Sequence, residues 1–195
     1  MPLLQKHWPA IAPLPGARVV VPLCGKTLDM PWLAAQGHEV LGIEVAAEGI
    51  AAFFAEQGVR HDAVDTPAGR LHRAGAIDIL EADVFEVEAD TLAGFRHVYD
   101  RAALIALPPD MRRRYVHELY ARLPAGCAGL LITLEYPPHE KQGPPFTVPE
   151  AEVRALYGRD WEVEVLERRA ILDQQPKFVE EGVTALDTVV YRLRR

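Results

Sequence analysis

Short apolar runs alternate along the chain with stretches whose apolar residues have helical spacing, and this alternation restricts the possible folds more than any other feature. Residues 18–23 (Arg-Val-Val-Val-Pro-Leu) and 38–44 (His-Glu-Val-Leu-Gly-Ile-Glu) are predicted strands, and residues 29–36 and 46–57 are predicted helices that follow them. A repeated order of strand and helix is typical of a parallel sheet covered by helices on both faces. The pattern therefore predicts an α/β fold with a doubly wound sheet.

Further elements continue this pattern toward the end of the chain. Predicted strands cover 77–80, 96–100, 129–135, 161–168 and 184–193, and predicted helices cover 108–123 and 150–156. The polar segment 60–70 and the Pro- and Gly-rich segment 137–149 are predicted to be loops. The last two strands have no full crossover helix between them, which predicts an antiparallel hairpin at one edge of the sheet. No repeat or linker divides the chain, so residues 1–195 are expected to form a single domain.

Composition and charge exclude several classes of protein. The net charge is −7, from 28 acidic and 21 basic residues, and this balance disfavours nucleic acid as a partner. No run reaches the roughly 18–20 apolar residues of a membrane-spanning helix, and the first residues do not have the pattern of a signal peptide. Cys24 and Cys127 are far apart, and the histidines are not spaced as metal ligands. We therefore expect a cytoplasmic protein with no membrane segment, no disulfide and no metal.

The loop after the first predicted strand contains glycine but does not match the common nucleotide-binding motifs. Gly25-Lys26-Thr27 resembles the end of a P-loop, but the first glycine of that motif would fall at Val20. The G-x-G-x-x-G motif is also absent. A single glycine at this place allows the backbone to approach a ligand closely without requiring a pyrophosphate.

Acidic residues follow the second and third predicted strands, at the sheet edge where α/β proteins bind ligands. Glu44 lies 19 residues after Gly25 and can accept hydrogen bonds from both hydroxyls of a ribose. Asp83 can accept a hydrogen bond from an adenine amino group. Each acid also has a simpler interpretation, as a solvated strand end or a turn residue. One glycine and two acids in these places suit an adenosyl ligand without a pyrophosphate, and S-adenosylmethionine is the common ligand of that kind.

Longer strings in the sequence are more specific than these single positions. They are residues 21–30, which include Pro-Leu-Cys-Gly-Lys, residues 32–44, residues 99–108, which include Asp-Arg, and residues 143–146. These strings span nearly the whole chain, and together they resemble the thiopurine S-methyltransferase family, in particular its bacterial branch. The resemblance implies a seven-stranded class I methyltransferase sheet with the last strand inserted antiparallel, and S-adenosylmethionine as the cofactor.

The resemblance also implies roles for individual residues around the cofactor. Leu23 would contact the cofactor through its backbone, beside Gly25. Glu44 would hold the ribose hydroxyls. Asp83 and Val84 would face the adenine.

Other matching positions fall near the substrate. Arg101 would lie near the methionine end of the cofactor and the incoming substrate, and the alternative for this residue is an ion pair with Asp100 that stiffens the strand end. Phe146, in the Pro- and Gly-rich loop, is either a lid over the pocket or a simple hydrophobic anchor. Lys177 falls roughly where the family has a late basic residue near the substrate.

The implied reaction is a direct displacement, in which the thiolate of a small-molecule thiol attacks the methyl carbon of a sulfonium. Because the cofactor is already activated by its positive charge, the protein mainly positions the two reactants. Arg101 would be the catalytic residue and would stabilise the thiolate by a charge-assisted hydrogen bond. Cys24 is interpreted as a packing thiol, since a methyl-accepting cysteine would not permit turnover. By resemblance alone, the family also suggests detoxification of selenium or tellurium oxyanions.

Two alternatives remain open. The first is a methyltransferase that acts on the oxygen or nitrogen of another small molecule. The second is a binding protein that does not catalyse, because family members begin with a Trp-containing segment and residues 1–9 resemble the part that follows it. Under this interpretation a cover over the cofactor is missing, and Trp8 is not its counterpart. In each case we expect a monomer.

Overall fold

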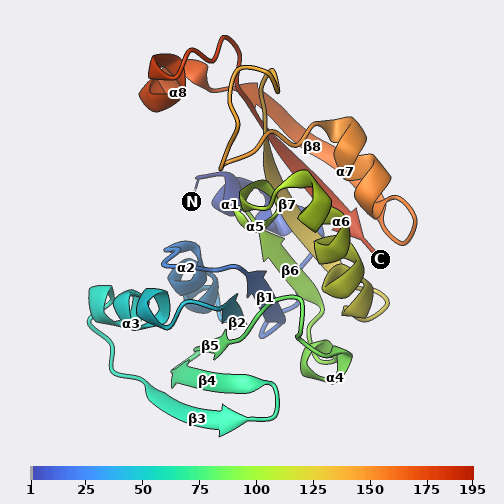
Figure 1. Cartoon of the computed structure of the whole chain (residues 1–195). Helices are drawn as coiled ribbons and strands as arrows, with labels where there is room; N and C mark the ends of the chain where they lie inside the picture. Colours follow the sequence, from blue (N-terminus) through green and yellow to red (C-terminus); the bar gives the residue numbers. More distant parts are fainter. Residues whose placement is uncertain (1) are drawn as a thin grey trace.

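The computed structural model of the chain describes residues 2–195, which form a nine-stranded sheet with helices on both faces (Figure 1). The strands are β1 (Arg18–Pro22), β2 (Glu39–Glu44), β3 (Asp62–Thr66), β4 (Gly69–Ala74), β5 (Ile77–Glu81), β6 (His97–Asp100), β7 (Ala128–Glu135), β8 (Glu162–Ala170) and β9 (Asp187–Arg194). The helices are α1 (Pro2–His7), α2 (Asp29–Ala35), α3 (Ala47–Glu56), α4 (Ala89–Leu92), α5 (Ala103–Ala106), α6 (Pro109–Glu118), α7 (Glu150–Tyr157) and α8 (Pro176–Glu180), with 3-10 turns η1 (Trp8–Ile11), η2 (Tyr120–Arg122) and η3 (Leu172–Gln174). The strand order is β3-β4-β5-β2-β1-β6-β7-β9-β8.

The strands at the centre of the sheet are parallel. β5, β2, β1, β6 and β7 pair in parallel in that order. Residues 19–21 pair with residues 40–42, which places two buried apolar runs side by side, as expected for strands covered on both faces. The prediction of an α/β fold with a mostly parallel sheet is confirmed, and the carboxyl ends of these strands meet at one edge of the sheet.

The predicted antiparallel hairpin near one edge is confirmed, and its second strand lies inside the sheet. β9 is antiparallel to both of its neighbours, β7 and β8, so the last strand of the chain is inserted between them. β8 forms the edge, and half-buried and exposed residues alternate along its first half. The resemblance implied this insertion.

The sheet has nine strands rather than seven, because the expectation of a loop at 60–70 is wrong. Residues 62–66 and 69–74 form the β3–β4 hairpin, which pairs antiparallel with β5. The Thr66 hydroxyl donates a hydrogen bond of 2.6 Å to the Gly69 carbonyl and closes the turn. β3 reads Asp-Ala-Val-Asp-Thr and is mostly exposed, so it lacks the apolar run by which the other strands were recognised.

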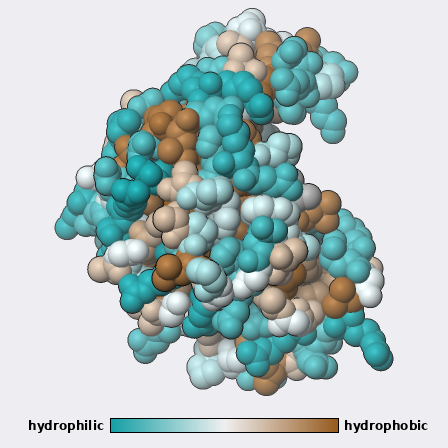
Figure 2. All heavy atoms as spheres, turned by 180° about the vertical axis from the view of Figure 1, so that it is seen from behind, coloured by the Kyte–Doolittle hydropathy of each residue, from teal (hydrophilic) through white to brown (hydrophobic). Residues whose placement is uncertain are grey.

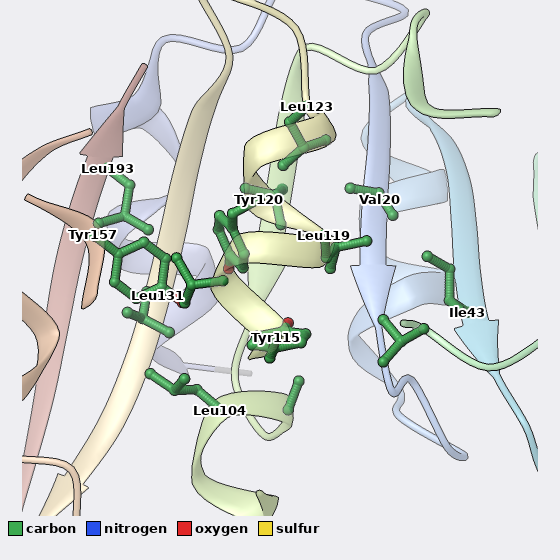
Figure 3. Close-up of a cluster of buried hydrophobic side chains, with 14 of the residues drawn as sticks. Val20, Ile43, Leu104, Tyr115, Leu119, Tyr120, Leu123, Leu131, Tyr157 and Leu193 are labelled. Atoms are coloured by element: carbon green, nitrogen blue, oxygen red, sulfur yellow. The ribbon is translucent and has the colours of Figure 1, made fainter. Parts of the chain in front are cut away.

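Two apolar clusters, one on each face of the sheet, hold the helices in place. One cluster contains side chains of α4, α5, α6 and α7 (Figure 3), and the other contains side chains of α1, α2 and α3. Tyr115 and Leu119, on the predicted apolar face of helix 108–123, are fully buried, and Leu119 points toward the side of β1 where Val20 lies. The helix itself ends at Glu118 and continues as η2, so its last predicted turn is tighter than expected.

The part of the chain that the structure describes contains no helix long and apolar enough to cross a membrane. Within the same residues no group of three or more His, Cys, Asp or Glu side chains is arranged to hold a metal ion. Cys24 and Cys127 are both free and buried.

Candidate functional site

A cleft of about 860 Å³ opens at the carboxyl edge of the sheet. Its walls come from the ends of β1, β6, β7, β8 and β9, from α1, and from the segment that contains η3 and α8. Figure 2 shows from behind that the α8 segment projects from the body of the molecule, with an indentation between the two. The volume falls in the range of about 300–1,000 Å³ that small-molecule sites occupy. The cleft therefore lies where the topology predicts a ligand site.

The backbone between β1 and α2 adopts a strained conformation at the wall of this cleft. Leu23 has a φ of 45°, in the left-handed region that bulky side chains rarely adopt, and Gly25 has a φ of 49°. The Cys24 N–H donates a hydrogen bond of 3.0 Å to the Ile43 carbonyl, and the Thr27 N–H donates one of 3.1 Å to the Cys24 carbonyl. A Cβ atom at Gly25 would meet nothing within 4 Å, so the space beside the loop is open to a ligand. Backbone strain of this kind gathers at ligand sites, and the sequence pattern did not reveal it.

Glu44, at the end of β2, is joined directly to this loop. One carboxylate oxygen accepts a hydrogen bond of 2.9 Å from the Gly25 N–H. The other accepts bonds of 2.9 Å from the N–H groups of Val45 and Ala46. A carboxylate has about four acceptor sites. The three hydrogen bonds fix the orientation of the Glu44 carboxylate and leave one acceptor site for a ligand. The structure thus brings two of the predicted cofactor residues, Gly25 and Glu44, into contact.

Asp83 and Val84 follow β5, the strand next to β2. The N–H of Ala82 donates a hydrogen bond of 3.1 Å to the Glu44 carbonyl, which holds the two strand ends together. Asp83 is exposed and accepts a bond of 3.0 Å from the Phe85 N–H, whereas Val84 is buried. Leu23 and Arg101 line the cleft, and Glu44, Asp83 and Val84 do not line it but follow neighbouring strands at the same edge of the sheet.

Arg101, just after β6, lines the cleft and is bound to a buried carboxylate. Its guanidinium donates a hydrogen bond of 2.9 Å to Asp29, whose side chain is 1% exposed. The Tyr99 hydroxyl donates one of 2.7 Å to the same oxygen. Burial acts to raise the pKa of Asp29, but the hydrogen bonds from Tyr99 and Arg101 outweigh it, and the pKa lies below its ordinary value. Because the Arg101 side chain is 52% exposed, it presents a fixed positive charge to the cleft.

Asp100 is not the partner of Arg101 that the alternative interpretation required. Its buried carboxylate accepts hydrogen bonds from the hydroxyls of Tyr115 (2.7 Å) and Tyr120 (3.1 Å) and from the N–H of Ala103 (3.1 Å). Burial raises the pKa of this carboxyl. Successive residues of a strand face opposite sides of the sheet, so Asp100 faces α6 while its neighbours on either side face Asp29.

Cys24 and Trp8 are packing residues. Burial, together with the charge of Glu44, raises the pKa of the Cys24 thiol far above its ordinary value, which disfavours the nucleophilic thiolate. Trp8 is buried in the cluster of α1, α2 and α3, and its indole N–H donates a hydrogen bond of 3.0 Å to His38. Trp8 does not line the cleft.

Phe146 and Lys177 are not among the residues that line the cleft. The Phe146 N–H donates a hydrogen bond of 2.7 Å to the carbonyl of Ile105, which is part of the wall, and the Arg112 guanidinium lies 5.5 Å from the centre of the Phe146 ring. Phe146 therefore packs behind the wall. Lys177 is exposed on α8, whereas its neighbour Phe178 is buried and lines the cleft.

Several polar residues of the cleft wall were not singled out from the sequence, and three of them have a charged side chain or contact one. Asp29, Tyr99 and Arg169 all line the cleft. Asp29 carried only the signal of a polar residue at the start of a predicted helix, and its partner Arg101 lies 72 positions later. Arg169 lies near the end of β8, after the alternation of half-buried and exposed residues has stopped. The sequence pattern therefore did not show on which face of the sheet its side chain lies.

The residues at this edge fit an adenosyl ligand that has no pyrophosphate. The open space at Gly25 permits close backbone approach, and Glu44 retains an acceptor site. The turn between β1 and α2 contains no run of glycines that could cradle a pyrophosphate. Together with the cleft next to them, these groups match the donor and acceptor needs of an adenosyl sulfonium.

Solved structures share the fold at low sequence identity. The YcgJ protein from Bacillus subtilis matches with a TM-score of 0.71 and 11% identity, over 98% of this chain and 97% of that chain. A Burkholderia thailandensis 1,6-didemethyltoxoflavin-N1-methyltransferase, solved with 1,6-didemethyltoxoflavin and S-adenosylhomocysteine, matches with a TM-score of 0.59 and 17% identity, over 100% and 76% of the two chains. The fold is that of the class I S-adenosylmethionine-dependent methyltransferases.

Sequence comparison identifies the family within this class. The profile of the family described as Thiopurine S-methyltransferase (TPMT) matches residues 1–195. A protein from Xanthomonas campestris pv. campestris (strain 8004), named Thiopurine S-methyltransferase, is 56% identical over 195 residues, which are 100% of this chain and 89% of that protein. The chain therefore belongs to the thiopurine S-methyltransferase family, and S-adenosylmethionine is its cofactor.

Proposed function

We propose that the chain transfers a methyl group from S-adenosylmethionine to the sulfur of a small thiol. The observation that carries the proposal is the half-exposed guanidinium of Arg101 in the cleft wall, fixed by the buried carboxylate of Asp29. The thiolate is the nucleophilic form of a thiol, and a preorganised cation favours it without reorganisation during the reaction. The family description and the name of the Xanthomonas relative support a sulfur acceptor.

In this proposal the cofactor is held at the ends of β1, β2 and β5. Leu23 and Gly25 contact it through the backbone of their strained turn, and Glu44 accepts hydrogen bonds from the ribose hydroxyls. Asp83 and Val84 face the adenine. The pairing of β2 with both β1 and β5 supports this assignment, because it places the three strand ends side by side.

The residues of the chain have little covalent chemistry to perform. Bound S-adenosylmethionine supplies a methyl group on a cationic sulfur, so that the acceptor sulfur gains the carbon–sulfur bond that the sulfonium loses. The thiol proton leaves to solvent before the attack, and Arg101 stabilises the resulting anion. Asp29 keeps the guanidinium in one orientation, so that the acceptor would meet a preorganised cation. Phe146 and Lys177 stay predictions for substrate binding, and their positions outside the cleft wall do not support them.

Arg101→Gln tests the role of the guanidinium. The half-exposed side chain should be replaced without loss of the fold, and kcat/KM for an aromatic thiol should fall by about 10²-fold, which is typical when one preorganised donor is removed. The thioether product is measured by liquid chromatography. Arg159→Gln is the matched control, since that arginine is 88% exposed and does not line the cleft. Full activity in the Arg101 variant would remove the proposed role.

Two further measurements separate the alternatives. Calorimetric titration with S-adenosylmethionine and S-adenosylhomocysteine, followed by product analysis, distinguishes a protein that only binds from one that turns over. A panel of thiol, hydroxyl and amine acceptors of similar size distinguishes sulfur from oxygen or nitrogen methylation. Selenite and tellurite belong in the same panel, because detoxification of these oxyanions is predicted only from the family resemblance.

A further inference from the structure

The charged side chains that line the cleft do not balance. In the described part of the wall the charged residues are Asp29, Arg101 and Arg169. Arg101 has Asp29 as a close partner, in an ion pair of 2.9 Å. Arg169, on β8, has no such partner among the described residues that line the cleft.

Arg169 also differs from its neighbour Arg168 in the partners it has. Arg168 faces the other side of the sheet, where it is bound by the carboxylates of Glu135 and Glu150. The Nε atom of Arg169 lies 4.0 Å from an oxygen of Glu167, and residues 2–195 place no other carboxylate within this distance of it. The Arg169 side chain is 48% exposed. Its N–H donors are therefore largely available to a ligand.

Glu167 does not neutralise the charge of Arg169, because its carboxylate is already bound by side chains of α1. The other oxygen of Glu167 accepts a hydrogen bond of 2.7 Å from Lys6 and lies 2.5 Å from the ring nitrogen of His7. These two hydrogen bonds lower the pKa of Glu167. The single charge of this carboxylate is thus shared among basic groups, of which Arg169 is the most distant.

Strand pairing fixes where Arg169 stands relative to Arg101. Leu134, Thr188 and Arg169 lie opposite one another on β7, β9 and β8, and all three line the cleft. Neighbouring strands are about 4.8 Å apart, so the three steps from β6 to β8 separate the two arginine positions by about 14 Å across the sheet. The two side chains therefore approach a common cleft from different ends.

We infer that Arg169 binds an anionic group, such as a carboxylate, at the end of the acceptor that lies away from its sulfur. This inference rests on the proposed function, because it names the class of thiol that is methylated. A guanidinium offers a fork of N–H donors that matches a carboxylate. The strands between the two arginines contribute Ile132 and Leu134 of β7 to the wall, and Ile171 and Phe178 add apolar surface beyond Arg169. The preferred acceptor is a small thiol whose apolar or aromatic body carries a carboxylate.

A pair of isosteric acceptors tests the inference. 4-Mercaptobenzoate and 4-mercaptobenzamide have nearly the same shape and an aromatic thiol, and they differ in the charge of the group opposite the sulfur. The wild-type chain should have a kcat/KM about tenfold higher for the acid, as expected for a charge-assisted hydrogen bond at a half-exposed site. Arg169→Gln should reduce this acid-to-amide ratio about tenfold, mainly through the KM of the acid. Arg169→Lys should restore part of it, and Arg169→Glu should favour the amide.

Arg159→Gln is again the matched control and should leave the acid-to-amide ratio unchanged. Thermal unfolding of each variant establishes that the ratio is compared between folded proteins. A wild-type chain that methylates acid and amide equally well, or an Arg169→Gln chain that keeps the preference, overturns the inference and leaves the proposed function standing. A chain that binds S-adenosylmethionine but methylates no thiol in the panel refutes the proposed function, and the inference fails with it.

Discussion

Asp29→Asn removes the charge that fixes Arg101 and changes the side-chain volume very little. The buried carboxylate accepts hydrogen bonds of 2.7 Å from Tyr99 and 2.9 Å from Arg101. A hydrogen bond to a charged group contributes about 1.5–3 kcal/mol, and breaking a fully buried ion pair costs about 3–5 kcal/mol. Because Arg101 is half exposed, water can solvate it once it is released, and an asparagine still accepts one hydrogen bond. We therefore expect the free energy of unfolding to fall by about 2 kcal/mol.

Thermal unfolding and steady-state kinetics measure the two consequences of this change. For a chain of this length about 1 kcal/mol corresponds to about 2–4 °C, so the Tm of Asp29→Asn should fall by about 4–8 °C. The released guanidinium no longer has one orientation, and kcat/KM for a thiol should fall about tenfold. An Asp29→Asn variant with wild-type Tm and wild-type kinetics would refute the reasoning.

The stabilisation by Asp29 depends on pH with a definite sign. The folded-state pKa of Asp29 lies below its ordinary value of 3.8, so the folded state favours the ionised carboxyl. Its contribution is fully present above the unfolded-state pKa of about 3.9 and is lost as the pH falls through the lower folded-state pKa. The difference in unfolding free energy between wild type and Asp29→Asn should therefore shrink on acidification. A difference that does not change with pH would contradict this assignment.

Two other predictions concern the cofactor residues and the buried histidines. Glu44→Gln should weaken S-adenosylmethionine binding about tenfold in calorimetry, since the ribose hydroxyls lose a charged acceptor, and an unchanged Kd would show that the sugar is held elsewhere. Burial lowers the pKa of His38 and His97, so the unfolded state binds more protons below its pKa of about 6.5, and the free energy of unfolding should fall between pH 7 and pH 5. His38→Gln should make this loss of unfolding free energy smaller. Denaturant titrations of both proteins at pH 7 and pH 5 measure the loss, and an equal loss in the variant and the wild type would contradict the prediction.

The centre of the fold could be predicted from the sequence because its strands are buried on both faces. Residues 19–21 and 40–43 are continuous apolar runs for that reason. β3 could not be predicted in this way, because the hydrogen bonds of its pairing with β4 hold it in the sheet while its side chains stay exposed. The helix prediction at 108–123 missed the change to η2, because the apolar spacing of these residues does not distinguish an α-helical turn from a 3-10 turn.

The candidate site was predictable in position but not in its contacts. The rule that ligands bind at the carboxyl ends of parallel strands was sufficient to select Gly25, Glu44 and Asp83, whereas Leu23 and Arg101 were implied by the family resemblance. It could not show that Asp29 would pair with Arg101, because that contact depends on how α2 packs beside β6. Nor could it show the positive φ of Leu23, since left-handed backbone at a leucine has no compositional signal.

The position of β9 between β7 and β8 makes residues 187–194 decisive for the completion of the sheet during synthesis. Until residues 187–194 leave the ribosome, β7 and β8 each retain an edge with unpaired N–H and C=O groups. Thr188, which lines the cleft beside Arg169, emerges with the same residues. The nascent polypeptide can thus complete the turn that contains Leu23 early, while the opposite half of the cleft waits for residues 187–194. In that interval two open strand edges are available to neighbouring chains, so β9 closes a route to aggregation as well as the sheet.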